Sequence, residues 1–345
     1  MHIRHKALAL AVVGLACVPT MASARSQIRA VGSSTVYPFA TAVAERLARA
    51  NPNMKPPVIE SVGTGGGIKL FCAGVGEQFP DIANASRRIK ASEVKSCAAN
   101  GVKAITEIQV GIDGIALATA KATPVSNVSA VDVYKALAKT PFGKPNKAKT
   151  WKDVNASLPA TPIRAFGPPP TSGTRDAFGE LIMTAGCNSN PAMKALAKSD
   201  SNKHKAICTA VREDGAFVET GESDNLIVQK LESNPGTIGI FGYSYLEEND
   251  KQIKGIAING VAPTYDSIAS FKYPGSRPLY IYVKNAHVRA IPAIKAFVAE
   301  FTKEAAWGKS GYLVKRGMIA APDAIRAKSA AAARALTPLD PAEIK

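Results

Sequence analysis

The stretch TSGTRD, residues 171–176, precedes a helical-looking run over 177–184 and combines hydroxyls, a glycine and an arginine where a helix should begin. A helix start presents unpaired backbone N–H groups and the positive end of the helix dipole. Hydroxyls add donors, the arginine adds a fixed charge, and the glycine lets backbone approach a ligand closely. This composition favours a site for a small tetrahedral oxyanion. Taken alone the signal is weak, because Ser172 before a helix is more often an ordinary N-cap.

Two further stretches repeat the same arrangement and strengthen the hypothesis. A predicted strand over 28–31 runs through GSST (32–35) into a helical pattern. A second strand over 58–62 runs through GTGGG (63–67) into a short helix. No G-K-[ST] follows these glycines, so this is not a nucleotide-binding P-loop. We refer to residues 32–35, 63–67 and 171–176 as the first, second and third turns.

Strands alternate with helices along the chain, which predicts α/β lobes with mostly parallel sheets. In such sheets ligands lie beyond the carboxyl ends of the strands, at helix N-termini. The first and second turns should then lie in one lobe and the third in the other. An anion between them would be buried in a cleft that closes on it.

The predicted lobes are joined by two passages of the chain. Apolar, β-rich runs on both sides of Asp113 predict the first passage, and a strand over 279–283 should return the chain to the first lobe. We expect lobe 1 to comprise residues 25–112 and 264–345, and lobe 2 to comprise residues 113–263. The end of the chain, from residue 320, is predicted to be a peripheral tail.

The first 24 residues have the pattern of a secretory signal peptide. Basic residues at 4–6 precede an apolar run over 7–18, and ASA at 22–24 is an A-x-A cleavage site. We predict cleavage after Ala24 and a periplasmic protein. Cys17 is compatible with a lipoprotein, but Gly14 suits a lipid-attachment motif poorly, so that alternative is less favoured.

The chain is strongly basic, with a formal net charge of +16. Loss of Arg4 and Lys6 with the signal peptide lowers this by two, to +14. The basic residues are dispersed, without a basic run or interleaved aromatics, so we expect no nucleic acid partner. Attraction of anions or of an anionic envelope surface fits better, and a basic surface without a role fits equally well.

Four cysteines remain after residue 24, an even number that suggests disulfides in an exported protein. Three pairings are possible, and we favour Cys72–Cys97 with Cys187–Cys208 because each closes a short loop within one lobe. We expect no metal, since the chain has no C-x-x-C and His204 and His287 lack ligand spacing. No cofactor is expected.

Six stretches match the motifs of one known family in order: GSSTVYPF (32–39), GTGGGIKLFCAG (63–74), DIANASR (81–87), VGIDGIAL (110–117), SGTRDAF (172–178) and NPGTIGIFGYSYLEEN (234–249). On these stretches the chain resembles the exported phosphate-binding proteins of bacterial phosphate ABC transporters. It implies a two-lobed type II periplasmic-binding-protein fold with a hinge of two chain crossings. It also implies capture of inorganic phosphate in the interlobe cleft, delivery to a membrane permease, and a monomer.

The resemblance also implies which residues contact phosphate. Here the chain departs from the better-known branch, which has an aspartate at the position of Arg87 and an arginine at the position of Pro168. We therefore expect Arg87 and Arg175 to supply the cationic contacts. The expected set is Ser34, Thr35, Thr64, Gly65, Ser86, Arg87, Ser172, Gly173, Thr174 and Arg175.

The departures leave open which group accepts the phosphate proton, and Asp176 and Asp113 are candidates. A carboxylate acceptor favours protonated phosphate over sulfate, whose oxygen would face it with lone pairs on both sides. For Asp176 a helix first-turn carboxylate is an equally good interpretation, and for Asp113 a structural role at the hinge.

Other functions remain as alternatives. Within the same class, the ligand could be another oxyanion such as sulfate or molybdate. An exported phosphatase would need a metal cluster or an activated nucleophile, and no His or Lys base stands at a supporting sequence spacing from Ser172. An envelope adhesin is suggested by charge alone. We expect a binding protein and no enzyme.

Overall fold

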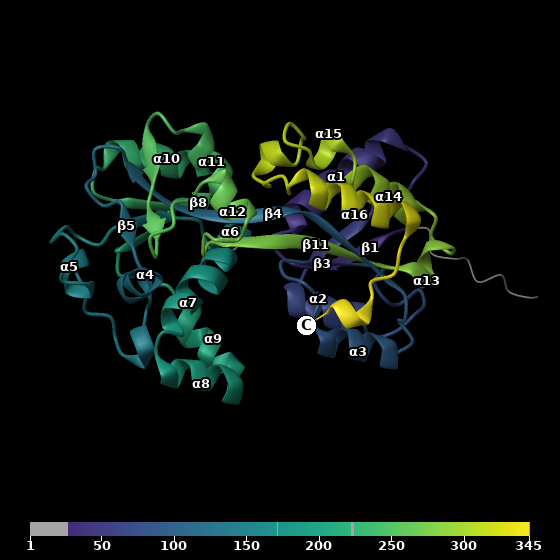
Figure 1. The fold of residues 1–345 in the computed structure, drawn as a ribbon, viewed down its shortest axis with the longest axis horizontal. Coiled ribbons are helices and arrows are strands. Elements are labelled where there is room, and N and C mark those ends of the chain that lie inside the picture. Colours follow the sequence, from purple (N-terminus) through teal and green to yellow (C-terminus); the bar gives the residue numbers. More distant parts are fainter. Residues whose placement is uncertain (1–26, 171, 222–223, 345) are drawn as a thin grey trace, which may run out of the picture.

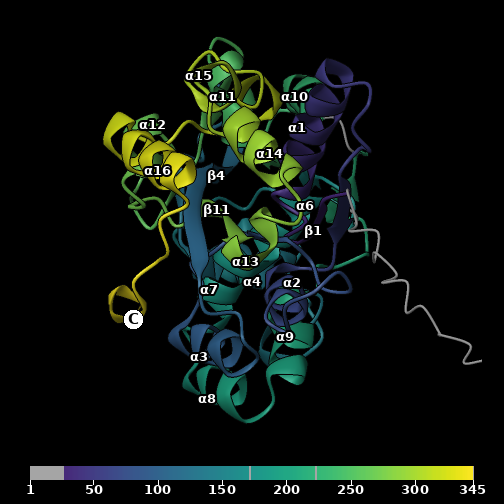
Figure 2. The same ribbon diagram turned by 90° about the vertical axis from the view of Figure 1, so that its right-hand side faces the viewer.

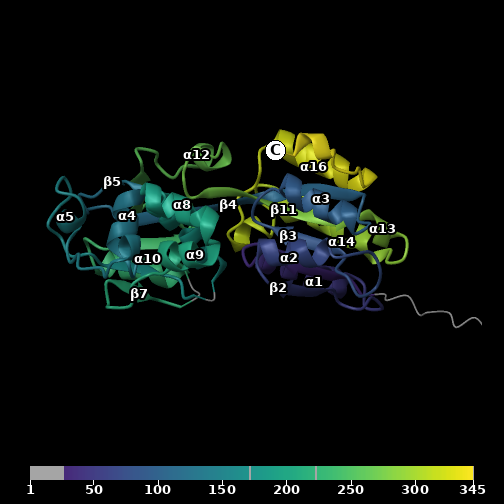
Figure 3. The same cartoon turned by 90° about the horizontal axis from the view of Figure 1, so that it is seen from below.

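The computed structural model describes residues 27–170, 172–221 and 224–344. The predicted signal peptide, with Cys17, and Thr171 of the third turn lie outside the described residues. Two α/β lobes lie side by side and are connected by two long strands, β4 (Ile105–Ala120) and β11 (Ser276–Lys284) (Figure 1). The view from below shows the same two strands running between the lobes (Figure 3). Among the described helices, none has the length and apolar character needed to cross a bilayer.

The first lobe is built on the sheet order β2-β1-β3-β11-β4. Strand β1 pairs in parallel with β2 and β3, and β11 is antiparallel to both β3 and β4. The bounds in this lobe are β1 Arg29–Gly32, β2 Val58–Ser61, β3 Ile82–Ala85, α1 Tyr37–Ala50, α2 Thr64–Phe71, α3 Ala91–Ala99, α13 Asn285–Val288, α14 Ala293–Phe301, α15 Glu304–Trp307 and α16 Asp323–Ala335.

Helices cover both faces of this sheet, with α1, α14 and α16 on one side and α2 and α3 on the other (Figures 1 and 2). The alternation of side chains along β11 shows why both faces are covered. Leu279, Ile281 and Val283 enter one hydrophobic core, while Tyr280 and Tyr282 enter the other. Successive side chains of a strand point to opposite faces, so an apolar strand without polar alternation requires a layer on each side.

The second lobe continues the sheet in the order β4-β8-β6-β7, and β9 also pairs with β4. Strand β6 is parallel to β7 and β8, whereas β4 is antiparallel to β8 and β9. The strand bounds are β5 Asn127–Val128, β6 Ala165–Gly167, β7 Phe217–Glu219, β8 Ile238–Gly242, β9 Ile253–Gly255 and β10 Ala257–Ile258. The helix bounds are α4 Ala130–Leu137, α5 Trp151–Val154, α6 Gly173–Ala177, a π-helix Phe178–Met183, α7 Thr184–Cys187, α8 Pro191–Ser199, α9 Ser201–Thr209, α10 Asp224–Ser233 and α11 Tyr243–Glu248. Helix α12, Tyr265–Ala269, lies between β10 and β11 in the chain.

Strand β4 belongs to both lobes. Ile108 and Val110 are buried in the first-lobe core, and Ile112 and Ile115 are buried in the second-lobe core. The two runs predicted around Asp113 are therefore one continuous strand. The sheet is mixed rather than mostly parallel, because β4 and β11 run antiparallel to each other and to their neighbours in both lobes. The lobe boundaries at 112/113 and 263/264 stay a prediction.

The expectation of a peripheral tail from residue 320 was wrong for most of that segment. Helix α16 packs along β4, and the backbone N–H of Gln109 donates to Ser329 Oγ at 3.2 Å. Arg326 is buried and pairs with Glu304 at 3.1 Å. Ala333 of this helix is buried in the first-lobe core, and Ala330 packs against it.

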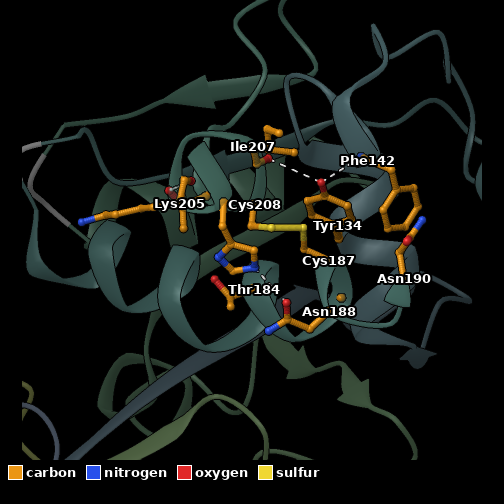
Figure 4. The surroundings of a disulfide bond; sticks show 12 residues. Tyr134, Phe142, Thr184, Cys187, Asn188, Asn190, Lys205, Ile207 and Cys208 are labelled. Atoms are coloured by element: carbon orange, nitrogen blue, oxygen red, sulfur yellow. Dashed lines mark hydrogen bonds between the residues drawn. A yellow bond between two sulfur atoms is a disulfide. The ribbon is translucent and has the colours of Figure 1, made fainter. Parts of the chain in front are cut away.

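Both favoured disulfides are present in the structure. Cys72 at the end of α2 is bonded to Cys97 of α3, and Cys187 of α7 is bonded to Cys208 of α9. Figure 4 shows the second bond between its two helices, with Tyr134 beside it. Each bond fastens two short helices that lie at the surface of their lobe.

Reduction of either disulfide is expected to lower the free energy of unfolding by about 3 kcal/mol. The bonds span 25 and 21 residues, and a cross-link of this length removes loop-closure entropy from the unfolded chain. Urea unfolding of the Cys72→Ser/Cys97→Ser and Cys187→Ser/Cys208→Ser variants would measure each contribution separately. An unchanged midpoint in both variants would contradict the expectation.

Candidate functional site

The first and second turns lie at one edge of the first-lobe sheet. They follow β1 and β2, which are parallel neighbours, so the carboxyl ends of these strands meet. The start of α2 comes very close to the first turn: a Cβ added to Gly67 would lie 2.4 Å from the Cα of Gly32. Only glycine permits this approach. Two predicted ligands also meet here, since Ser86 N donates to Thr64 Oγ1 at 3.0 Å and the two hydroxyl oxygens are 3.0 Å apart.

The third turn faces the first turn across the two lobes. Ser34 Oγ donates to Asp176 Oδ2 at 2.7 Å. A Cβ added to Gly173 would lie 3.0 Å from the carbonyl oxygen of Ser34 and 3.0 Å from the Cα of Thr35. Ser172 is the N-cap of α6 and accepts from Thr174 N at 3.2 Å. The ordinary capping role of Ser172 is therefore present, and it orients the helix start toward the first lobe.

A cavity of about 200 Å³ lies between the lobes at this meeting point. Its walls include Thr35, Asp113, Ser172, Gly173, Thr174 and Arg316. The structure thus brings four of the predicted phosphate ligands and one predicted proton acceptor to a single cavity. Gly65, Thr64 and Ser86 are not among its lining residues.

Sequence reasoning missed the buried cation of this region, Arg277 at the start of β11. Its Nε lies 3.1 Å from Asp113 Oδ2, its Nη1 lies 2.7 Å from Glu180 Oε2, and its Nη2 donates to Thr35 Oγ1 at 2.5 Å. Its side chain is only 6% exposed. The signal that could have found it is a charged residue near the start of an otherwise apolar strand, since buried charges require partners.

Burial raises the pKa of Asp113, and the nearby charge of Arg277 opposes that rise. The ion pair with Arg277 makes Asp113 a structural carboxylate of the hinge strand as well as a lining residue of the cavity. Asp176 already accepts a hydrogen bond from a hydroxyl of the first turn. Both remain candidates for the phosphate proton acceptor.

The two arginines expected to contact the anion have partners within their own lobes. Arg87 donates to both carboxylate oxygens of Glu93, at 2.9 and 2.7 Å, and this hydrogen bonding raises the pKa of Arg87. Arg175 donates to the carbonyl of Pro168 at 2.9 Å, and its guanidinium carbon lies 4.2 Å from the ring centre of Phe217. Burial lowers the pKa of Arg175. A phosphate contact of either residue stays a prediction.

Among the described residues, one group has three side chains close enough to hold a metal ion, namely Cys187, His204 and Cys208. Its two sulfurs are bonded to each other, so they cannot serve as thiolate ligands. His204 lies beside them and its Nε2 is 2.8 Å from Asn188 Oδ1 (Figure 4 shows Asn188 and the disulfide). The polar side chains that line the interlobe cavity are hydroxyls, two carboxylates and one arginine, Arg316.

Comparison with known proteins agrees with this geometry. Residues 18–305 match the model of a family described as a PBP superfamily domain. Protein SphX of Synechococcus elongatus is 35% identical over 279 residues, which cover 77% of this chain and 72% of that protein. The phosphate-binding protein PstS of Staphylococcus haemolyticus is 31% identical over 308 residues, 87% of this chain and 82% of that protein. The crystal structure of a possible phosphate binding protein from Planctomyces limnophilus has a TM-score of 0.71 at 30% identity, covering 89% of this chain and 97% of that one.

Proposed function

This chain belongs to the phosphate-binding proteins of the PBP superfamily, and we propose that it captures inorganic phosphate between its lobes and delivers it to the permease of an ABC transporter. The observation that carries the proposal is the meeting of the first and third turns at one interlobe cavity. Both turns are hydroxyl-rich helix starts, and such starts bind oxyanions through N–H and O–H donors. Hydroxyls on opposite lobes let one anion hold the lobes together.

The residues proposed to contact phosphate around the cavity are Thr35, Ser172, Gly173 and Thr174. Ser34, Thr64, Gly65 and Ser86 are proposed as further donors from the first lobe, and Arg87 and Arg175 as cations that would have to exchange their present partners. An anion can shift the equilibrium between the open and closed forms only if its affinities for the two forms differ. The proposal therefore requires phosphate to bind the closed form more tightly than the open one.

Two further parts of the proposal concern export and the absence of catalysis. The pattern of residues 1–24 supports export to the periplasm. The PstS relative is named a phosphate-binding protein, and we propose that this chain likewise binds phosphate and catalyses no reaction. In support, Ser172 Oγ serves as a helix cap, and His204 and His287 have partners away from the cavity, Asn188 and Asp81.

Isothermal titration of the phosphate-stripped protein at neutral pH is the test. We expect one phosphate per chain and sulfate affinity weaker by roughly 100-fold, because an unpaired lone-pair contact in a closed site is penalised. Thr174→Val should weaken phosphate binding about tenfold or more by removing one donor. Equal binding of both anions would refute the selectivity, and binding of neither would refute the function.

Thr41→Val is the matched control for Thr174→Val. Thr41 lies in α1, and its Oγ1 is buried without a hydrogen-bond partner in the described structure. The same change of hydroxyl to methyl there should leave phosphate affinity within about twofold of the parent, since no hydrogen bond is lost.

A further inference from the structure

The side chain of Arg277 joins three segments that are distant in the sequence. Through its Nε it is paired with Asp113 of the hinge strand, and through its Nη1 with Glu180 of the second lobe. Its Nη2 donates to the hydroxyl of Thr35 in the first turn. A guanidinium has five N–H donors in a fixed planar fork, so seating one carboxylate restricts where the remaining donors point.

The contact with Thr35 decides how that hydroxyl can act. A threonine hydroxyl has one proton to donate and lone pairs that accept. Because Arg277 donates to Thr35 Oγ1, one lone pair is occupied and the hydroxyl proton must point elsewhere. Thr35 lines the interlobe cavity, which leaves its proton available to an anion bound there.

Glu180 makes this arrangement dependent on the second lobe. It lies in the π-helix that continues α6, so it moves with the third turn. Its side chain is 51% exposed while that of Arg277 is 6% exposed, so the carboxylate reaches a buried cation from the rim of the interlobe contact. Separation of the lobes would remove this carboxylate from Nη1 and leave Asp113 as the ion-pair partner of the guanidinium.

We propose that Arg277 is a positioning residue that couples lobe closure to anion binding: Glu180 fixes the guanidinium when the lobes close, and the guanidinium then holds the Thr35 hydroxyl with its proton toward the anion. The inference rests on the proposed function, because it describes how the same site tightens on phosphate. Arg277 acts through Thr35 and needs no contact of its own with the anion.

A double-mutant cycle between the lobes tests the coupling. Phosphate affinity and dissociation rate are measured for the parent, Glu180→Ala, Thr35→Val and the double variant. We expect Glu180→Ala to weaken phosphate about tenfold, mainly through faster dissociation, because the closed form loses its contact. In the Thr35→Val background the same change should weaken it less than about threefold, since the hydroxyl that transmits the effect is absent.

Two controls separate coupling from general stability. Thr35→Ser keeps a hydroxyl and should restore the full effect of Glu180→Ala. Asp214→Ala removes a comparable carboxylate from the same lobe, because Asp214 is 53% exposed and forms an ion pair with Arg212, which is 8% exposed. This variant should keep phosphate affinity within about twofold of the parent. Melting temperatures without phosphate reveal any loss of fold.

The outcomes are distinguishable. A loss from Glu180→Ala that is equal in the parent and in the Thr35→Val background, or no loss at all, would overturn the positioning role while leaving phosphate binding intact. Failure of the parent protein to bind phosphate would overturn the proposed function and this inference together. If Glu180→Ala lowers phosphate affinity only as much as Asp214→Ala does, the contact between Glu180 and Arg277 stabilises the fold without positioning Thr35.

Discussion

Replacing Arg277 with methionine is expected to lower the free energy of unfolding at neutral pH by about 3–5 kcal/mol. The guanidinium is the ion-pair partner of Asp113, whose side chain is 12% exposed. Methionine fills similar volume but supplies no charge, so the carboxylate would be left buried and uncompensated. Breaking one side of a buried pair is far more destabilising than replacing both sides. Urea unfolding followed by circular dichroism measures the effect.

The loss should depend on pH in a direction set by Asp113. Burial raises the pKa of this carboxyl even with Arg277 present, and removal of the cation would raise it further. The pKa of an aspartate carboxyl in an unfolded chain is about 3.9. Where the pKa in the folded protein is higher than this, ionisation of the carboxyl destabilises the folded state. Its penalty is complete above the folded pKa and fades as the pH falls toward the unfolded value. The variant should therefore approach the parent in stability between pH 7 and about pH 4.

The double variant Arg277→Met/Asp113→Asn is the control for this explanation. Asparagine removes the buried charge, so the double variant should be more stable than Arg277→Met at neutral pH. Its free energy of unfolding should also lack the part of the pH dependence that comes from ionisation of Asp113. A stability difference between Arg277→Met and the parent that stays constant with pH would mean that the arginine contributes packing rather than charge compensation.

The turns were predictable because their signals are local. Glycine and hydroxyls between a strand pattern and a helix pattern fix where each helix starts, and parallel pairing then places the first two turns at one edge. The N-cap role of Ser172 follows from the same few residues. The disulfide pairing was also accessible, since short loops separate the partners.

The charge network was not predictable because its members meet only through the fold. Arg277 lies 242 residues from Thr35 and 164 from Asp113, and no spacing rule connects such positions. Arg87 shows the opposite situation: Glu93 stands six residues later and accepts hydrogen bonds from both Nη atoms of Arg87. Local charge pairing of this kind competes with ligand binding, so phosphate would have to displace Glu93 from Arg87.

Gly173→Ala is expected to weaken phosphate binding by about 10- to 100-fold while leaving the unfolding free energy nearly unchanged. The added Cβ would lie 3.0 Å from the carbonyl oxygen of Ser34 and 3.0 Å from the Cα of Thr35, both backbone atoms of the other lobe. Because these atoms cannot rotate away, the lobes must separate slightly for the methyl to fit. Within its own helix, alanine is a better residue than glycine, so the fold itself should not suffer.

Gly66→Ala provides the matched control for the added methyl. Gly66 also lies near the start of a short helix, but it does not line the cavity, and its added Cβ would have no neighbour closer than 3.7 Å, an ordinary contact distance. Titration should therefore show a large loss for Gly173→Ala and a change within about twofold for Gly66→Ala. Small-angle scattering with saturating phosphate should show a less closed Gly173→Ala protein. Parent-like affinity in Gly173→Ala would mean that phosphate binding does not require the first and third turns to approach as closely as they do in this structure.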